Sequence, residues 1–213
     1  MSIVMAATLS GRLCKVRGMN APAILRDVFN ALQKELGEED EGVAFDNGPG
    51  PLDRIDIMVY RAKEPSAVTV FATVGMSVEP MPATEGQAAG ERAELRLLRR
   101  GPVSPADEGR IAIQLANLAA HPWSFGRPLG WGEIVTFGAD VATFPGHHHA
   151  FLAGPWTTDQ AGFLETGTAA VRIITVVPVS EAERARALTT RPETFFSDLL
   201  DTRDVLAPPG QLK

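Results

Sequence analysis

Residues 67–81 constrain the fold most strongly, because this segment alternates like a strand that is covered on both faces. Its first half splits into two apolar or β-branched sets, which are Val68, Val70, Ala72 and Val74 on one side and Thr69, Phe71 and Thr73 on the other. A period of two with such residues predicts a central strand. Gly75 ends the strand, and Pro80 keeps the following residues out of a ladder. We therefore expect a central strand that runs directly into a loop.

Other strands and helices are predicted on both sides of this strand. Strands are expected at 53–61, 92–98, 133–137, 148–152 and 169–177, and helices at 21–36, 105–120, 180–188 and 190–200. Segment 53–61 should pair with the central strand as an antiparallel hairpin. The order lacks a regular βαβ alternation, which favours α+β. The predicted fold is a single domain with a central mixed, mostly antiparallel sheet packed with helices.

Local signals place the ends of these elements. Asn20, Ser104 and Ser180 are predicted N-caps, with a capping box from Ser180 to Glu183 and a second from Thr190 to Glu193. In the strand at 92–98, Glu94 and Arg96 should point outward, which predicts a place nearer the edge of the sheet. The acidic run 38–41 is expected to be a solvated loop, 46–51 a turn, and Pro178 the end of its strand.

Size and charge limit the classes of function. The chain has 213 residues and a net charge of −6, which disfavours nucleic acid as a partner. No apolar run reaches the roughly 20 residues that cross a bilayer. The single cysteine, Cys14, cannot form an internal disulfide, so the cytoplasm is the expected location. We expect a leader at 1–18, a domain at 19–206 and a flexible tail at 207–213.

The sequence contains no recognisable catalytic motif. Gly75-Met76-Ser77-Val78-Glu79 follows a strand as a hydrolase nucleophile would, but the second glycine is missing and Pro80 prevents a helix. No Walker loop, dinucleotide fingerprint or paired acid and base appears. We therefore predict no catalytic residue and no cofactor.

Histidines provide the alternative to that prediction. In His147-His148-His149, the first and third side chains would share one face of a strand. With His121 as a third ligand, they could hold a metal, in a metal-binding protein or a metal-dependent enzyme. A structural role for the same histidines stays open.

Aromatic residues crowd the irregular segment 121–159, namely Trp123, Phe125, Trp131, Phe137, Phe144, Phe151 and Trp156. Such residues form a satellite core, or they anchor a binding surface. A small-ligand pocket beneath them is a third possibility.

Several short motifs resemble the suppressor of fused family, in its bacterial type. They are Thr73-Val74-Gly75-Met76-Ser77, Pro80-Met81, Arg92-Ala93-Glu94-Leu95, Pro145-Gly146-His147-His148, and 171–179 followed by Glu181 and Glu183. Their order and spacing agree with the family over about 21–200. Val78 departs from the pattern, because an acid is expected after Gly-Met-Ser.

The resemblance implies a sandwich-like α/β domain without catalytic residues that binds protein, in some cases by adding a partner strand to a sheet edge. Animal relatives bind a transcription factor peptide in a cleft of a two-domain protein, whereas bacterial relatives are associated with immunity against polymorphic toxins. This chain is expected to be too short for the second animal domain. We predict a non-enzymatic protein-binding domain of the immunity type, with a basic toxin domain as partner and no membrane or nucleic acid. The predicted partner contacts are Met76, Met81, Trp131, His147, His149 and Trp156.

Overall fold

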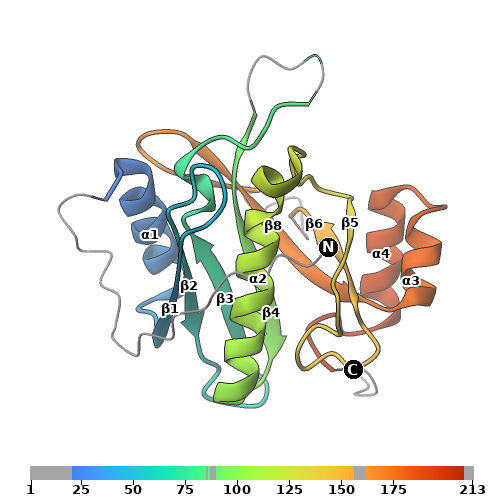
Figure 1. The fold of residues 1–213 in the computed structure, drawn as a ribbon. Coiled ribbons are helices and arrows are strands. Elements are labelled where there is room, and N and C mark those ends of the chain that lie inside the picture. The colour runs from blue at the N-terminus through green and yellow to red at the C-terminus, as the bar shows by residue number, and fades with distance from the viewer. Residues whose placement is uncertain (1–20, 85, 87–89, 156–161, 209–213) are drawn as a thin grey trace.

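The protein is one mixed sheet with helices packed on both of its faces (Figure 1). The computed structural model describes residues 21–84, 86, 90–155 and 162–208. The strands are β1 (Glu41–Asp46), β2 (Arg54–Tyr60), β3 (Val68–Val74), β4 (Arg92–Arg100), β5 (Ile134–Thr136), β6 (His149–Ala153), β7 (Phe163–Glu165) and β8 (Ala170–Val179). The helices are α1 (Ala23–Leu36), η1 (Met76–Val78, a 3-10 turn), α2 (Pro105–Phe125), α3 (Glu181–Ala187) and α4 (Pro192–Thr202).

The strand order confirms the predicted sheet. The strands lie in the order β1-β2-β3-β4-β8-β6-β5, and β7 pairs with β8 outside this path. Only β4 and β8 run parallel among the described pairs. β2 and β3 form the expected antiparallel hairpin, in which Met58 lies opposite Ala72. The α+β fold with a mostly antiparallel sheet is therefore as predicted.

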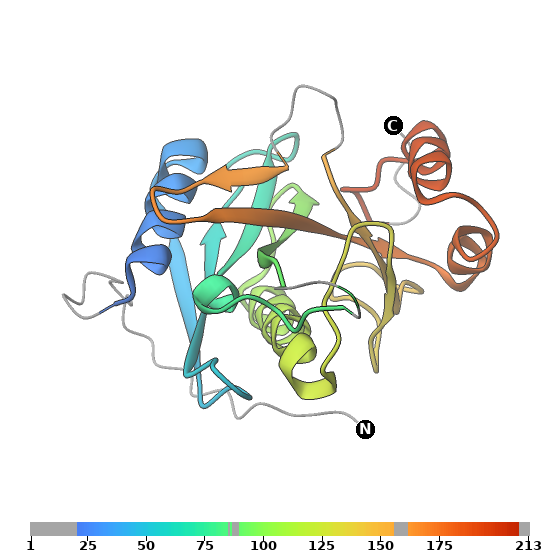
Figure 2. The same ribbon diagram turned by 90° about the horizontal axis from the view of Figure 1, so that it is seen from above.

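Helices cover the two faces of the sheet in different places (Figure 2). α2 packs on one face against a core that includes Phe71, Leu95 and Ile174. α1 covers the opposite face of β2 and β3, where Met58 and Ala72 belong to a second core. On that same face, α4 closes the far end of β8 and β6 with Phe195 and Leu199. The middle of this face lies between α1 and α4.

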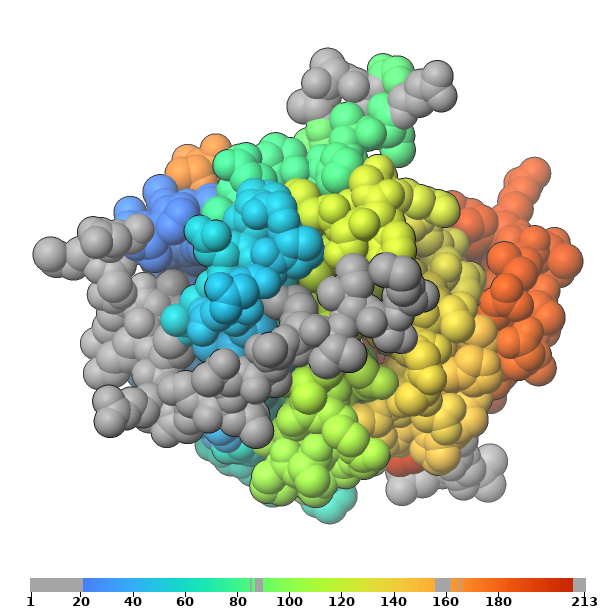
Figure 3. All heavy atoms as spheres, viewed as in Figure 1, coloured from blue at the N-terminus to red at the C-terminus, as the bar shows by residue number. Residues whose placement is uncertain are grey.

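On the face that carries α2, the irregular segments on either side of β5 (126–133 and 137–148) lie beside that helix (Figure 3). α3 and α4 form the right-hand side of the molecule in the same view. Among the described residues, no helix is long and apolar enough to cross a bilayer. The cytoplasmic location and the domain boundaries stay predictions, and the predicted leader lies outside the described residues.

Several elements differ from the sequence prediction. No strand was predicted at β1, which begins at Glu41, so the end of the acidic run is a strand rather than a solvated loop. β7 was not expected at all, because three residues carry too little periodicity. β8 continues through Pro178, which lies opposite Ala150 where only β6 pairs with β8. α2 continues past Ala120 to Phe125 with Pro122 inside it.

Two of the four predicted caps are present. The Ser104 hydroxyl accepts from the backbone N–H of Asp107 at 3.2 Å. Ser180 and Glu183 form the expected capping box at the start of α3. The box from Thr190 to Glu193 is wrong, because α4 begins after Arg191 without a side-chain cap. Asn20 lies outside the described residues.

Glu94 corrects a further expectation, because its side chain points inward and is buried with 1% exposure. β4 lies between β3 and β8, near the middle of the sheet rather than nearer its edge. The Glu94 carboxylate accepts from the backbone N–H groups of Gly75 and Ser77, both at 3.0 Å. It also accepts from the hydroxyls of Ser77, at 2.6 Å, and Thr73, at 2.5 Å. The loop after β3 is thereby tied to β4.

Glu183 ties α3 to the chain beyond α4. Its carboxylate accepts from Nε of Arg203 at 2.7 Å and from the backbone N–H of Ser180 at 2.7 Å. Burial alone would raise the pKa of Glu183, but these hydrogen bonds outweigh burial and leave the pKa below its ordinary value.

We expect Glu183→Gln to lower the free energy of unfolding at pH 7 by about 1.5–3 kcal/mol, because a charged acceptor is lost. The folded state lowers the pKa, so the contribution of Glu183 is present above the ordinary value of 4.5 and disappears as the pH falls through the folded value. Urea unfolding of both proteins at pH 7 and at pH 3 measures the difference. Asp201→Asn, at an exposed position, is the control. A difference that stays the same at both pH values would contradict this account.

Candidate functional site

A groove crosses the open middle of the sheet face between α1 and α4. Its central hollow has a volume of about 490 Å³ and is lined by residues of α1, β4, β7 and β8, among them Glu35, Arg96, Leu98, Phe163, Ile173 and Thr175. A second hollow of about 380 Å³ continues it toward α4 and shares Gly154 and Pro155 with it. A third, beside α1, shares Glu35, Phe163 and Leu164. We call these three hollows the sheet-face groove.

Trp131 and Phe163 form an aromatic wall at the rim of the sheet-face groove, on the side of the sheet that carries α2. They lie on that side because Phe163 is opposite Arg172 in the β7–β8 register and Trp131 packs against the core beneath α2. Their rings meet edge to face with centroids 5.7 Å apart. The Trp131 indole N–H donates to the carbonyl of Ile173 at 3.0 Å, which fixes the ring against β8. The Arg172 guanidinium lies 4.6 Å from the centre of the Trp131 ring, as in a cation–π contact. Phe163 is 40% exposed, so this wall presents an apolar edge to solvent.

The floor of the groove carries one ion pair. The two terminal nitrogens of Arg96 each donate to a carboxylate oxygen of Glu35 at 2.8 Å, in a forked arrangement. The Arg96 side chain is only 15% exposed, whereas that of Glu35 is 46% exposed. The groove therefore combines apolar walls with a polar pair on its floor, as binding sites commonly do.

At the α4 end, aromatic side chains continue the apolar surface. Phe151 stacks on Phe196 with ring centroids 5.4 Å apart, and it meets Phe195 at 5.2 Å. Phe195 is fully buried and holds α4 on the sheet, while Phe196 lines the second hollow. Packed side chains thus shape the α4 end of the groove.

Two glycines allow Trp131 to lie flat in this wall. A Cβ atom on Gly154 would lie 2.9 Å from Cδ2 of Trp131, and one on Gly162 would lie 2.6 Å from Cη2. Both distances are shorter than van der Waals contact, so neither position has room for a side chain unless the indole moves.

We expect Gly154→Ala to displace Trp131 and to lower the free energy of unfolding by about 1–3 kcal/mol, as overpacking does. Thermal unfolding and tryptophan emission measure the two effects. Gly130→Ala is the matched control, because its Cβ would meet only the Glu133 side chain, at 3.9 Å. Equal effects from both substitutions would show that the close approach to Trp131 has no consequence.

The predicted partner contacts fall in different parts of the molecule. Trp131 lines the sheet-face groove. Met76 and Met81 are 0% and 2% exposed and belong to the core beneath α2, so they contact the protein interior. Trp156 lies outside the described residues. The sequence analysis did not select Phe163, because no motif surrounds it and no predicted site residue lies next to it along the chain.

His147 and His149 are also buried, at 7% and 4% exposure. Nε2 of His147 lies 3.6 Å from an Oε2 of Glu183, and its Nδ1 contacts the carbonyl of Pro145 at 3.0 Å. His149 instead reaches Glu181, with 2.6 Å between Nε2 and Oε2. The two histidines therefore contact different acidic residues. β6 begins only at His149, so side chains in the turn before it do not alternate between the two faces of the sheet.

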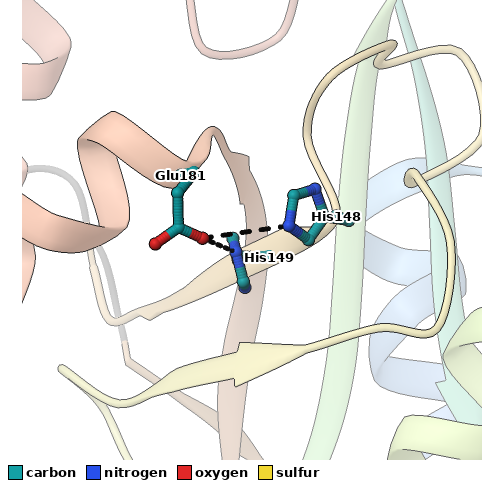
Figure 4. Close-up of side chains that lie close together, drawn as sticks. All are labelled: His148, His149 and Glu181. Atoms are coloured by element: carbon teal, nitrogen blue, oxygen red, sulfur yellow. Dashed lines mark hydrogen bonds and ion pairs between the residues drawn. The ribbon is translucent and has the colours of Figure 1, made fainter.

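The predicted metal set of His121, His147 and His149 is corrected by this arrangement. Among the described residues, the one group that gathers three ligand atoms is His148, His149 and Glu181 (Figure 4). His121 lies on α2, where its ring packs 4.5 Å from that of Phe125. Burial lowers the pKa of His121. A cavity of about 640 Å³ lies beside His121, between α2 and 127–139, and a small ligand there stays a prediction.

These features define a class: an α+β domain whose mixed sheet leaves one face open as a preformed groove. The family model described as suppressor of fused protein matches residues 51–207, which is more than half of the chain. The chain belongs to the suppressor of fused family, as the sequence motifs indicated.

Solved structures share this fold. A suppressor of fused homologue from Neisseria gonorrhoeae has a TM-score of 0.61 at 17% identity, over 85% of this chain and 91% of that one. A chain of the Sufu–Fu complex has a TM-score of 0.58 at 14% identity, over 90% of both chains. Drosophila suppressor of fused has a TM-score of 0.56 at 15% identity, over 86% of this chain and 46% of that one. No curated protein matches the chain.

Proposed function

We propose that this chain is a non-enzymatic protein-binding module whose partner lies in the sheet-face groove. The suppressor of fused family is a family of binding proteins, and one solved relative is part of a Sufu–Fu complex. The observation that carries the proposal is the groove with an exposed aromatic at its wall, Phe163. Exposed aromatic residues in packed surroundings are typical anchors of protein interfaces.

The proposed partner is a basic protein, and the proposed use is neutralisation of a toxin domain. The net charge of −6 supports a basic partner, because opposite charges speed association and salt slows it. The resemblance of the sequence motifs to bacterial members supports the immunity-type use. A cytoplasmic location belongs to the same proposal.

A segment of the partner could reach the protein in a second way, by pairing with a free sheet edge. β1 and β5 end the strand order, and each pairs with one neighbour among the described strands. β5 is only three residues long, which limits the ladder it can offer. The groove presents the exposed ring of Phe163, so we favour it and treat edge pairing as the competing outcome.

Reconstitution of a complex tests the proposed function. The purified, untagged chain is used to capture proteins from its native host, and each captured protein is then purified and titrated calorimetrically. We expect a saturable complex with one basic protein and an association rate that falls as salt rises. If no purified candidate binds in solution, the proposed function is wrong.

A further inference from the structure

A cluster of two histidines and one glutamate lies apart from the sheet-face groove, where β6 meets α3 (Figure 4). One ligand atom from each of His148, His149 and Glu181 lies within 4.8 Å of the others. His149 begins β6, His148 precedes it, and Glu181 is the first residue of α3. The three side chains converge from two elements that are far apart in the sequence.

Both histidines turn the same nitrogen, Nε2, toward the glutamate. Nε2 of His149 lies 2.6 Å from Oε2 of Glu181, and Nε2 of His148 lies 3.9 Å from the same oxygen. In a tetrahedral site with bonds of 2.0–2.2 Å, two ligand atoms lie about 3.3 Å apart. One observed separation is shorter than this value and one is longer, and the two histidine nitrogens lie within 4.8 Å of each other, so small side-chain rotations of Glu181 and His148 are required to bind one ion.

The other nitrogen of each histidine faces a polar group, which is within hydrogen-bond distance for His149 only. Nδ1 of His149 lies 2.9 Å from the hydroxyl of Thr136 on β5. Nδ1 of His148 lies 3.8 Å from Oδ1 of Asp140, and the other oxygen of Asp140 accepts from the backbone N–H of Gly146 at 2.8 Å. Histidines that bind metal through one nitrogen are oriented by such a partner on the other.

We propose that His148, His149 and Glu181 bind one divalent transition metal ion of the zinc class. Two imidazoles and one carboxylate suit Zn²⁺, and three protein ligands leave at least one coordination position for water. Thr136 suits His149 both with and without the metal ion, since its hydroxyl can donate to Nδ1 or accept from it. The inference is independent of the groove and of any partner that lies there.

An ion can reach the cluster from solvent, and one carboxylate oxygen of Glu181 faces the histidines. The side chains of His148 and Glu181 are 41% and 61% exposed, whereas that of His149 is 5% exposed. Arg184 donates to Oε1 of Glu181 at 3.0 Å, which leaves Oε2 directed at the histidines. A bound ion would join the start of β6 to the start of α3.

Equilibrium dialysis against ZnCl₂, followed by elemental analysis, tests the proposal. The untagged protein carries Cys14→Ser, so that no thiol competes for the ion. We expect one equivalent of Zn²⁺ and a rise of the unfolding temperature on its addition. His148→Ala and Glu181→Ala should each weaken binding at least ~10-fold, and Thr136→Val, which removes an orienting partner, by about 10–100-fold.

His121→Ala is the control, and it should bind Zn²⁺ as the parent protein does. His148 and Glu181 are exposed enough to be replaced without unfolding the chain, which circular dichroism checks for each variant. Less than roughly 0.2 equivalents of bound metal in the parent protein would overturn the proposal. Binding that His148→Ala and Glu181→Ala leave unchanged would overturn it equally.

Discussion

Glu94→Ala is expected to lower the free energy of unfolding by about 3–5 kcal/mol, because several buried donors lose their acceptor and each donor left unpaired costs about 1–3 kcal/mol. Glu94 is 1% exposed and accepts four hydrogen bonds, from the hydroxyls of Thr73 and Ser77 and from the backbone N–H groups of Gly75 and Ser77. Alanine would leave these donors buried without an acceptor. Urea unfolding at pH 7 measures the change.

Glu79→Ala is the matched control, because Glu79 follows the same loop but its side chain is 57% exposed. Its ion pair with Arg92 spans 3.8 Å, so its loss should cost less than about 1 kcal/mol. Ser77→Ala should fall between the two, since the backbone donors keep their acceptor. If Glu94→Ala proves no more costly than Glu79→Ala, Glu94 does not hold the loop after β3.

Phe163→Lys is expected to weaken binding of the reconstituted partner by about 100-fold, which corresponds to about 2.7 kcal/mol. Phe163 lies where two of the three hollows meet, and its ring edge is open to solvent. A lysine removes an aromatic anchor and repels a basic partner. Because Phe163 is 40% exposed, the substitution should leave the fold intact. Calorimetric titration against the purified partner gives the affinity.

The control for this prediction is Leu188→Lys, which makes the same kind of change at a leucine that is 61% exposed beyond α3. It should leave the affinity within about twofold, as surface changes outside an interface do. Equal affinities for the parent chain and Phe163→Lys would show that the partner does not bind at Phe163 in the groove. The protein-binding function itself would still stand.

Periodicity predicted most of the fold because the long elements bury one face or both. β3, with its two alternating sets, and α2, with its Ser104 cap, are examples. β7 was missed because it has three residues and is defined by its pairing with β8. Glu94 was placed outward because alternation on β4 was interpreted as one wet face. In fact its neighbours are two paired strands, and donors of the Gly75–Ser77 loop form hydrogen bonds with the buried carboxyl group.

The candidate site could be predicted only in part. Trp131 was chosen for its residue type, and the structure places it in the groove wall. Phe163 on β7 and Arg96 on β4 also line the groove. No local sequence pattern predicts that these two residues lie near each other. The methionines of the motif loop are buried, so that motif describes packing around Glu94. The histidine pairing changed because alternation in β6 starts at His149, one residue later than the predicted strand.

Hydrogen exchange of the chain, alone and bound to the reconstituted partner, tests most directly whether binding occurs in the sheet-face groove. The account predicts new amide protection around β7 (Phe163–Glu165) and in α4, with the outer edges of β1 and β5 unchanged. Protection confined to β5 or β1, with β7 and α4 exchanging as in the free chain, would contradict it.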